Sequence, residues 1–311
     1  MNISRKVKVG VTLTGCAILL LFLNKGYVSR ESSHTSLTAQ YLKVRKQPAL
    51  ITLFTTWKTF PEIYDVYNNT LRNWPRLLPD VTIIVFTNDH IPDKYKQLGW
   101  TVLPVKHQVK GHPILKHMFL EAIQLQPHSQ LYGFANADLL FTDSLVESLR
   151  AVVSSPVLFK KTFLVVGRRM NTPNITREEA SSWRNITKAS KRGKLMEATR
   201  GIDYFITSPN YHWRHIPGVQ VGQKLYDNWL VWDARRMGYH VIDVTNTLLA
   251  VHQDAPYPKQ HGRMNQNLVL IKEPSQKLYN RGVVACCNLY TVHINRTIRL
   301  QRKKLPKHCF H

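Results

Sequence analysis

Acidic residues and cysteines are both scarce in this chain of 311 residues. It has 19 Asp and Glu against 43 Lys and Arg, which gives a formal net charge of +24. Four cysteines are too few for a disulfide-dense scaffold, and 14 glycines and 16 prolines are too few for a collagen-like chain. Because 43% of the residues are hydrophobic, the chain can build a core. Its basic charge indicates an anionic partner: nucleic acid, anionic lipid, a phosphorylated cofactor or an acidic glycan.

The common phosphate-binding and nucleophile motifs are also missing. The chain reads Thr-Thr-Trp-Lys at 55–58, after the first predicted strand, where a dinucleotide enzyme would carry GxGxxG. Neither GxxxxGK[ST] nor GxSxG occurs anywhere in the sequence. These absences argue against a typical dinucleotide enzyme, a nucleotide kinase, a sulfotransferase and an α/β-hydrolase.

The N-terminus carries one uncharged apolar run, of about 15 residues at 9–23, between basic flanks. As a helix it would cover roughly 23 Å, short of the ~30 Å of an average bilayer. Thinner secretory-pathway membranes and snorkelling lysines narrow that difference. We expect a cytoplasmic tail (1–8), a signal-anchor transmembrane helix (9–24), a stem (25–47) and a luminal domain with a basic C-terminal tail (48–311). A cleaved signal peptide and a buried N-terminal helix are the alternatives.

Four N-x-[ST] sequons fit a body that faces the lumen of the Golgi or the endoplasmic reticulum. The possible N-glycan sites are Asn68, Asn174, Asn185 and Asn295. A luminal location sets nucleic acid aside as a partner. Cys16 falls in the predicted anchor, which leaves three luminal cysteines. One of the adjacent pair Cys286 and Cys287 can bridge to Cys309 and hold the basic tail, and the third thiol is then free or intermolecular.

From Ala49 onward, continuous apolar runs alternate with helical patterns. Predicted strands cover 49–56, 81–89, 101–105, 131–141, 163–167, 201–209 and 240–245. Predicted helices cover 62–74, 94–98, 114–125, a segment capped by Asp143 that ends near Val152, and 225–237. Such runs predict a parallel sheet with helices on both faces. The polar stretch 171–200 is predicted to be a long surface loop.

Asn136 and Asp138 form the strongest chemical signal. They lie two residues apart at the carboxyl end of a predicted buried strand, where ligands bind in open α/β sheets. In extended chain their side chains project to the same side. Their oxygens suit a hard divalent cation such as Mn²⁺ or Mg²⁺. The alternative is an Asx turn that ends the strand.

The segment resembles the D-x-D motif of GT-A glycosyltransferases, with Asn136 in place of the first Asp. Other short motifs follow in the order of a GT-A-like nucleotide-diphospho-sugar transferase: Thr87-Asn88-Asp89, Gly167-Arg168-Arg169, residues 219–230, Val241-Ile242-Asp243 and Val251-His252-Gln253. The resemblance covers roughly residues 50–255. It implies a GT-A-like, Rossmann-like fold in a type II membrane protein. Gly222-Gln223 and Asp254 depart from the pattern, at the end of the site that would contact phosphate.

The resemblance also implies roles for individual residues. Asp138 would be the principal metal ligand, Asn136 would assist it, and His252 would contact the metal or the diphosphate. Asp227 would act as general base toward the acceptor hydroxyl if the enzyme inverts. The alternative for His252 is a structural histidine at a strand end.

The remaining roles concern the donor nucleotide. Thr55 and Asp89 would contact the nucleoside, and Lys116 or Arg168 would neutralise the diphosphate. A turn carboxylate is the alternative for Asp89, and a solvated surface cation is the alternative for Lys116 and Arg168.

The predicted activity is metal-assisted transfer of a sugar from a nucleotide-diphosphate donor to a hydroxyl of a glycan, glycoprotein or glycolipid. Two other classes stay open. One is a catalytically inactive GT-A-like protein that binds a glycan or serves as a scaffold. The other is a basic secretory protein that binds glycosaminoglycans. The excess positive charge lies mainly in 184–200 and in 296–307, outside the predicted metal site.

Overall fold

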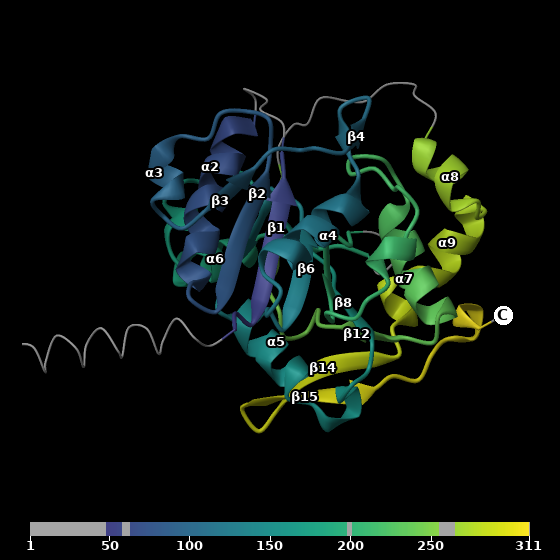
Figure 1. The fold of residues 1–311 in the computed structure, drawn as a ribbon. Coiled ribbons are helices and arrows are strands. Elements are labelled where there is room, and N and C mark those ends of the chain that lie inside the picture. Colours follow the sequence, from purple (N-terminus) through teal and green to yellow (C-terminus); the bar gives the residue numbers. More distant parts are fainter. Residues whose placement is uncertain (1–47, 58–62, 198–200, 255–264, 311) are drawn as a thin grey trace, which may run out of the picture. The chain divides into compact units, whose positions relative to one another are not determined.

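Most of the predicted apolar runs form strands of one nine-stranded sheet in the computed structural model, which describes residues 48–57, 63–197, 201–254 and 265–310 (Figure 1). The strand order is β15-β14-β12-β8-β11-β6-β1-β2-β3. The bounds are β1 (Ile51–Thr56), β2 (Val81–Phe86), β3 (Thr101–Leu103), β6 (Leu131–Ala135), β8 (Phe163–Val166), β11 (Tyr204–Thr207), β12 (His240–Asp243), β14 (Leu289–Ile294) and β15 (Thr297–Arg302).

The sheet is mostly parallel, as predicted. Only β11, between β6 and β8, and the edge strand β15 pair with their neighbours in antiparallel fashion. Side chains alternate between two cores: Leu53 of β1 packs on one face of the sheet and Phe54 on the other. The predicted cover of helices on both faces is therefore confirmed.

Different helices supply the two cores. One face is covered by α2 (Tyr64–Asn73), α3 (Asp93–Lys96) and α5 (Ser144–Val153), and the other by α4 (Leu115–Leu125), α7 (Tyr226–Arg236), α8 (Gln266–Ile271) and α9 (Ser275–Arg281). Figure 1 shows α7, α8 and α9 grouped together on their side of the sheet. Trp229 of α7 is buried in this core, so it is a packing residue.

A second sheet of four strands carries part of the later site. Its order is β10 (Lys194–Leu195), β9 (Met170–Pro173), β13 (Ala250–Asp254) and β7 (Leu139–Phe141). The sequence pattern did not predict β13 as a strand. Its register against β7 pairs His252 with Leu139, one residue after Asp138. This register brings two distant motifs together.

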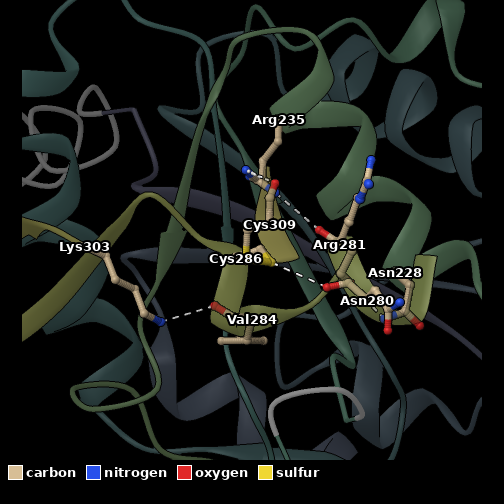
Figure 2. Close-up of a disulfide and its surroundings, with 9 residues drawn as sticks. Asn228, Arg235, Asn280, Arg281, Val284, Cys286, Lys303 and Cys309 are labelled. Atoms are coloured by element: carbon tan, nitrogen blue, oxygen red, sulfur yellow. Dashed lines mark hydrogen bonds between the residues drawn. A yellow bond between two sulfur atoms is a disulfide. The ribbon is translucent and has the colours of Figure 1, made fainter. Parts of the chain in front are cut away.

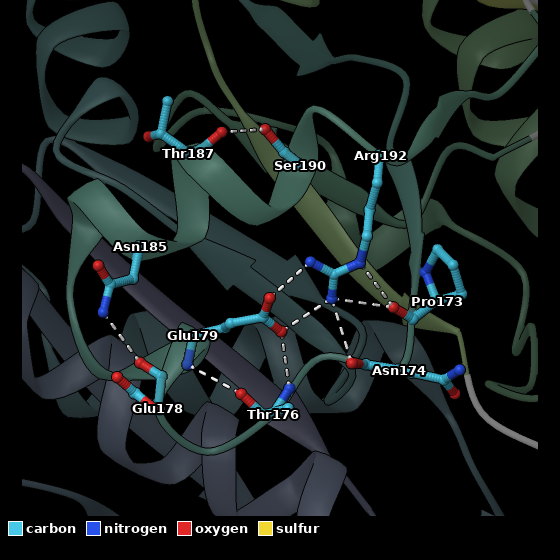
Figure 3. Close-up of polar contacts among 9 residues, drawn as sticks. All are labelled: Pro173, Asn174, Thr176, Glu178, Glu179, Asn185, Thr187, Ser190 and Arg192. Atoms are coloured by element: carbon cyan, nitrogen blue, oxygen red, sulfur yellow. Dashed lines mark hydrogen bonds and ion pairs between the residues drawn. The ribbon is translucent and has the colours of Figure 1, made fainter.

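The stretch 171–200 is more regular than the predicted loop. It contains the helix α6 (Trp183–Ser190), whose first turn is capped by Ser182 through a hydrogen bond from the Asn185 backbone N–H at 3.1 Å. Figure 3 shows the Arg192 guanidinium bonded to both carboxylate oxygens of Glu179 and to two backbone carbonyls. The loop prediction is wrong, because α6 buries Ile186 and Ala189 and the segment also contributes strands to a sheet.

A second local correction concerns Asp143, which was predicted to cap α5. Asp143 precedes the helix, but its own backbone is helical and its side chain makes no capping hydrogen bond. Thr142 Oγ1 accepts the Ser144 backbone N–H at 3.3 Å instead. The cap therefore lies one residue earlier than predicted.

The asparagine-rich sequence of α2 packs inward. Asn68 is buried and its Oδ1 accepts a hydrogen bond from Tyr95 at 2.5 Å. Asn73 pairs with both backbone groups of Phe141, at 2.8 and 2.9 Å, and so completes the free edge of β7. A glycan on Asn68 is incompatible with this packing, so Asn68 is removed from the predicted acceptors.

A disulfide joins Cys286 to Cys309 and anchors the C-terminal tail (Figure 2). Cys287 is buried and free, and burial raises the pKa of its thiol. Arg235 of α7 donates a hydrogen bond to the Cys309 carbonyl at 2.9 Å, which ties the tail to the helix. The two cysteines are 23 residues apart, a loop closure that stabilises the fold by about 3 kcal/mol. The predicted pairing with Cys309 is confirmed.

Within the described ranges, no helix combines the length and the apolar character needed to cross a membrane. The predicted anchor (9–24) and stem (25–47) lie outside those ranges.

Candidate functional site

A cleft of about 660 Å³ opens at the carboxyl ends of β1 and β6. Its described lining is Thr56, Tyr67, Asn136, Ala137, Asp138, Gly201, Ile202, Asp203, Val221, Gly222, Gln223, Lys224, Leu225, Tyr226, Asp227, Asn228 and Tyr279. The carboxyl edge of parallel strands is where open α/β sheets bind ligands. Three carboxylates on one cleft form its main chemical feature.

Asp138 lines this cleft and faces His252, which is not among the described lining residues. Asp138 lies in the turn between β6 and β7, and His252 Nε2 is 3.2 Å from its Oδ2. Both side chains are buried. The Gln253 backbone N–H donates to the Asp138 carbonyl at 3.1 Å, which holds the turn against β13. The structure therefore brings together two of the three residues predicted to hold the metal, Asp138 and His252, which lie far apart in the sequence.

Asn136 and Asp203 lie beside this pair. The antiparallel register of β6 and β11 places them opposite each other, and the Asn136 backbone N–H donates to the Asp203 carbonyl at 2.9 Å. The Asp203 carboxylate pairs with Arg169. Burial raises the pKa of Asp203 and Asp138 adds to the rise, whereas Arg169 and His252 oppose it. Asp203 is thus a buried acid that interacts electrostatically with Asp138 and His252.

Sequence reasoning missed Asp203. The available signal was an acidic residue inside the predicted buried strand 201–209, where an unpaired charge is costly. Its partner Arg169 was visible in the Gly167-Arg168-Arg169 motif, but the pairing depends on the β8–β11 register.

Asp227 lies in the first turn of α7, on the same cleft. The helix begins after Leu225, whose backbone is left-handed at φ 73°. Burial raises the pKa of Asp227 to about 6, and Asp203 adds to the rise, while hydrogen bonds from backbone N–H groups oppose it. The next residue fixes the position, because Asn228 Nδ2 donates to the Gly282 carbonyl at 2.8 Å. A carboxylate with this pKa can gain and lose a proton near neutral pH.

Tyr67 of α2 forms an aromatic wall of the cleft. Its ring stacks on Trp57, with centroids 5.0 Å apart and planes 10° from parallel. Burial, and then Asp138 and Asp89, raise the pKa of the Tyr67 hydroxyl. Asp89 therefore lies near Tyr67, but it is not among the described residues that line the cleft.

Three predicted donor contacts lie elsewhere. Thr55 is fully buried, and its neighbour Thr56 lines the cleft, because successive side chains of β1 point to opposite faces. Arg168 turns away and donates to the Met196 carbonyl at 3.3 Å. Lys116 lies on α4 and is not part of the described lining. The exposed Lys224 is the basic side chain that the described lining does contain.

Gly222-Gln223, where the sequence departs from the GT-A-like pattern, lies in a loop that His112 holds in place. His112 Nδ1 lies 3.0 Å from the Val221 carbonyl and its Nε2 lies 3.2 Å from Gln223 Nε2. The carbonyl requires a donor, so Nδ1 carries the proton and Nε2 accepts from the Gln223 amide. Gly222 has φ 86°, which suits a residue without Cβ. Gln223 thus holds a cleft-lining loop by a neutral hydrogen bond.

No protein-family model and no curated protein matches the sequence. Among solved structures, a mannosyltransferase from Pyrobaculum calidifontis, in complex with GDP-Man and Mn²⁺, matches with 14% identity and a TM-score of 0.38. That match covers 70% of this chain and 59% of the mannosyltransferase. Glucosyl-3-phosphoglycerate synthase from Mycobacterium tuberculosis, in complex with Mn²⁺, UDP and phosphoglyceric acid, matches with 13% identity, a TM-score of 0.42, and coverage of 83% and 88%.

The same synthase was also solved with UDP-glucose.

Proposed function

We propose that this chain transfers a sugar from a nucleotide-diphosphate donor to a hydroxyl of a glycan, glycoprotein or glycolipid. The supporting observation is the convergence of Asp138, Asp203 and Asp227 on one cleft at the carboxyl edge of the sheet, with His252 3.2 Å from Asp138. The cleft is within the size range of small-molecule sites, roughly 300–1,000 Å³.

The residues at the Asp138 end fit a divalent cation. Asp138 offers a carboxylate, Asn136 an amide oxygen and His252 an imidazole nitrogen, a donor set that suits Mn²⁺ or Mg²⁺. Among the described residues, His252 Nδ1 is buried and lacks a hydrogen-bond partner, while its Nε2 lies 3.2 Å from Asp138 Oδ2. A cation held here would act as a Lewis acid toward the leaving diphosphate.

Asp227 supplies the second part of the proposed chemistry. With a pKa of about 6 it is mostly ionised at pH 7, and it accepts the proton of the acceptor hydroxyl as that oxygen attacks the sugar. Asp203, paired with Arg169, adds to the rise in the pKa of Asp227. Tyr67, stacked on Trp57, offers a flat face to the donor.

A donor scan tests the proposal. The full chain should show a rise in Tm with one nucleotide sugar out of a panel of UDP and GDP sugars, and only with Mn²⁺ or Mg²⁺ present. Mn²⁺ with free sugars provides the matched control. A panel without any metal-dependent shift would contradict donor binding and favour an inactive scaffold.

We further propose that the chain is a single-pass type II protein of the Golgi or endoplasmic reticulum, with its body in the lumen. The disulfide suits an oxidising compartment. Asn174 and Asn295 are exposed, whereas the Asn185 amide donates to the Glu178 carbonyl at 3.2 Å. Treating protein from secretory cells with a glycosidase should raise its gel mobility, and N174Q/N295Q should lose most of that change. An unaltered mobility would contradict the luminal placement.

A further inference from the structure

A second cavity, of about 490 Å³, shares no described lining residue with the cleft. It lies between α2 and the segment 177–181. Its lining is Asn69, Arg72, Arg76, Arg177, Glu178, Ala180 and Ser181. Three guanidinium groups and one carboxylate give this small space an excess of positive charge.

The three arginines of this cavity outnumber its one carboxylate, that of Glu178. None of the three forms an ion pair within the part of the chain that the structure describes. Arg76 Nη1 donates to the Ala180 carbonyl at 3.3 Å, and burial lowers its pKa. The neighbouring Glu179 is engaged by Arg192, so it does not compensate them. An anion in the cavity would be attracted by the three guanidinium groups.

The wall that carries Arg177 is held in place. Figure 3 shows Arg192 bonded to Glu179 and to the carbonyls of Pro173 and Asn174. Thr176 and Glu179 bond each other reciprocally, with the Thr176 N–H on Glu179 Oε2 at 3.0 Å and the Glu179 N–H on Thr176 Oγ1 at 3.2 Å. These bonds pre-organise the segment on which Arg177 lies, so less ordering accompanies binding.

We propose that this cavity binds the sulfate or phosphate monoester of a saccharide. The planar guanidinium forks match tetrahedral oxyanions, and several of them can share one. The cavity is larger than a bare oxyanion requires, and the Ser181 hydroxyl in its lining can meet a sugar hydroxyl. The site is separate from the proposed transfer reaction and does not depend on it.

Binding of glucose 6-sulfate and glucose 6-phosphate to the full chain, without metal or nucleotide, tests this site by calorimetry. We expect one or both to bind. R177Q should weaken binding by at least about tenfold, because one charge-assisted hydrogen bond is lost. R72Q/R76Q/R177Q should abolish it. The tighter ligand identifies whether sulfate or phosphate is the natural group.

The control is R296Q/R299Q/R302Q, which removes the same charge from the β14–β15 hairpin. It should bind like the unmodified chain. R177Q keeps the test valid if the triple variant fails to fold, because Arg177 is exposed and its side chain forms no hydrogen bond or ion pair with the described residues. Absence of binding to the unmodified chain, or an equal loss in the control, would overturn the proposal. Neither result bears on donor binding.

Discussion

Replacing Asp138 with Asn should abolish the metal-dependent rise in Tm with the donor and lower transfer at least about 100-fold. Losing a group that only orients a metal ligand already costs 10–100-fold, and a direct ligand should cost more. Asn is similar in shape, so the contacts of the turn with Gln253 should persist. Titration of Mn²⁺ and donor by calorimetry measures the loss directly.

The matched control for D138N is D80N. Asp80 forms an exposed ion pair with Arg150. It lies at the amino-terminal ends of β1 and β2, whereas the cleft lies at the carboxyl ends of the strands. This variant should keep donor binding and transfer. If D138N bound metal and donor as tightly as D80N does, Asp138 would not be the metal ligand.

Asp227→Asn should lower kcat by a factor of about 10²–10⁴, the usual contribution of a general base, and leave metal-dependent donor binding intact. In the unmodified chain, transfer should fall as the pH drops through about 6, because protonated Asp227 cannot accept the acceptor proton. Asp203 and Arg169 are the charged groups that face it. Stopped transfer assays across pH 5–8 measure this profile. A D227N chain with unchanged kcat would exclude the role.

The same pKa gives a stability check on D227N. Burial raises the pKa of Asp227, so the folded state binds a proton more tightly than the unfolded state does. The stability that this proton provides is fully present below the unfolded pKa and is lost as the pH rises through about 6. D227N should therefore match the unmodified chain in Tm near pH 4 and equal or exceed it at pH 7. A lower Tm at pH 7 would mean that the variant loses activity through folding.

Much of the fold follows from local patterns in the sequence. The continuous apolar runs predict most strands of the large sheet, because a strand buried on both faces needs no polar alternation. The strand β13 was missed because His252, Gln253 and Asp254 interrupt its apolar run. Its position depends on pairing with β7 and β9, which lie more than 70 residues away.

The site shows the same limit at the level of single residues. Asp138 and Asp227 were predicted because both lie at the ends of elements that the sequence pattern defines. Asp138 lies at the carboxyl end of a predicted strand, and Asp227 lies at the start of a predicted helix. The nucleoside contact was predicted at Thr55, whereas the next residue, Thr56, lines the cleft. A shift of one residue along a strand moves the side chain to the opposite face of the sheet. Asp203 depends on a register that the sequence does not encode locally. Asn68 was predicted as a glycan site because a sequon does not show whether its asparagine is buried.

The bonds of Gln253 have a consequence for how the sequence can change. Its Oε1 accepts from Asn69 at 2.9 Å, and its Nε2 donates to the Val66 carbonyl and Thr70 Oγ1, while its backbone holds Asp138. Loss of either amide alone leaves a buried polar group unpaired, at a cost of about 1–3 kcal/mol. Positions 69 and 253, separated by 184 residues, should therefore change together in related chains. A substitution inherited at one of them calls for a compensating substitution at the other.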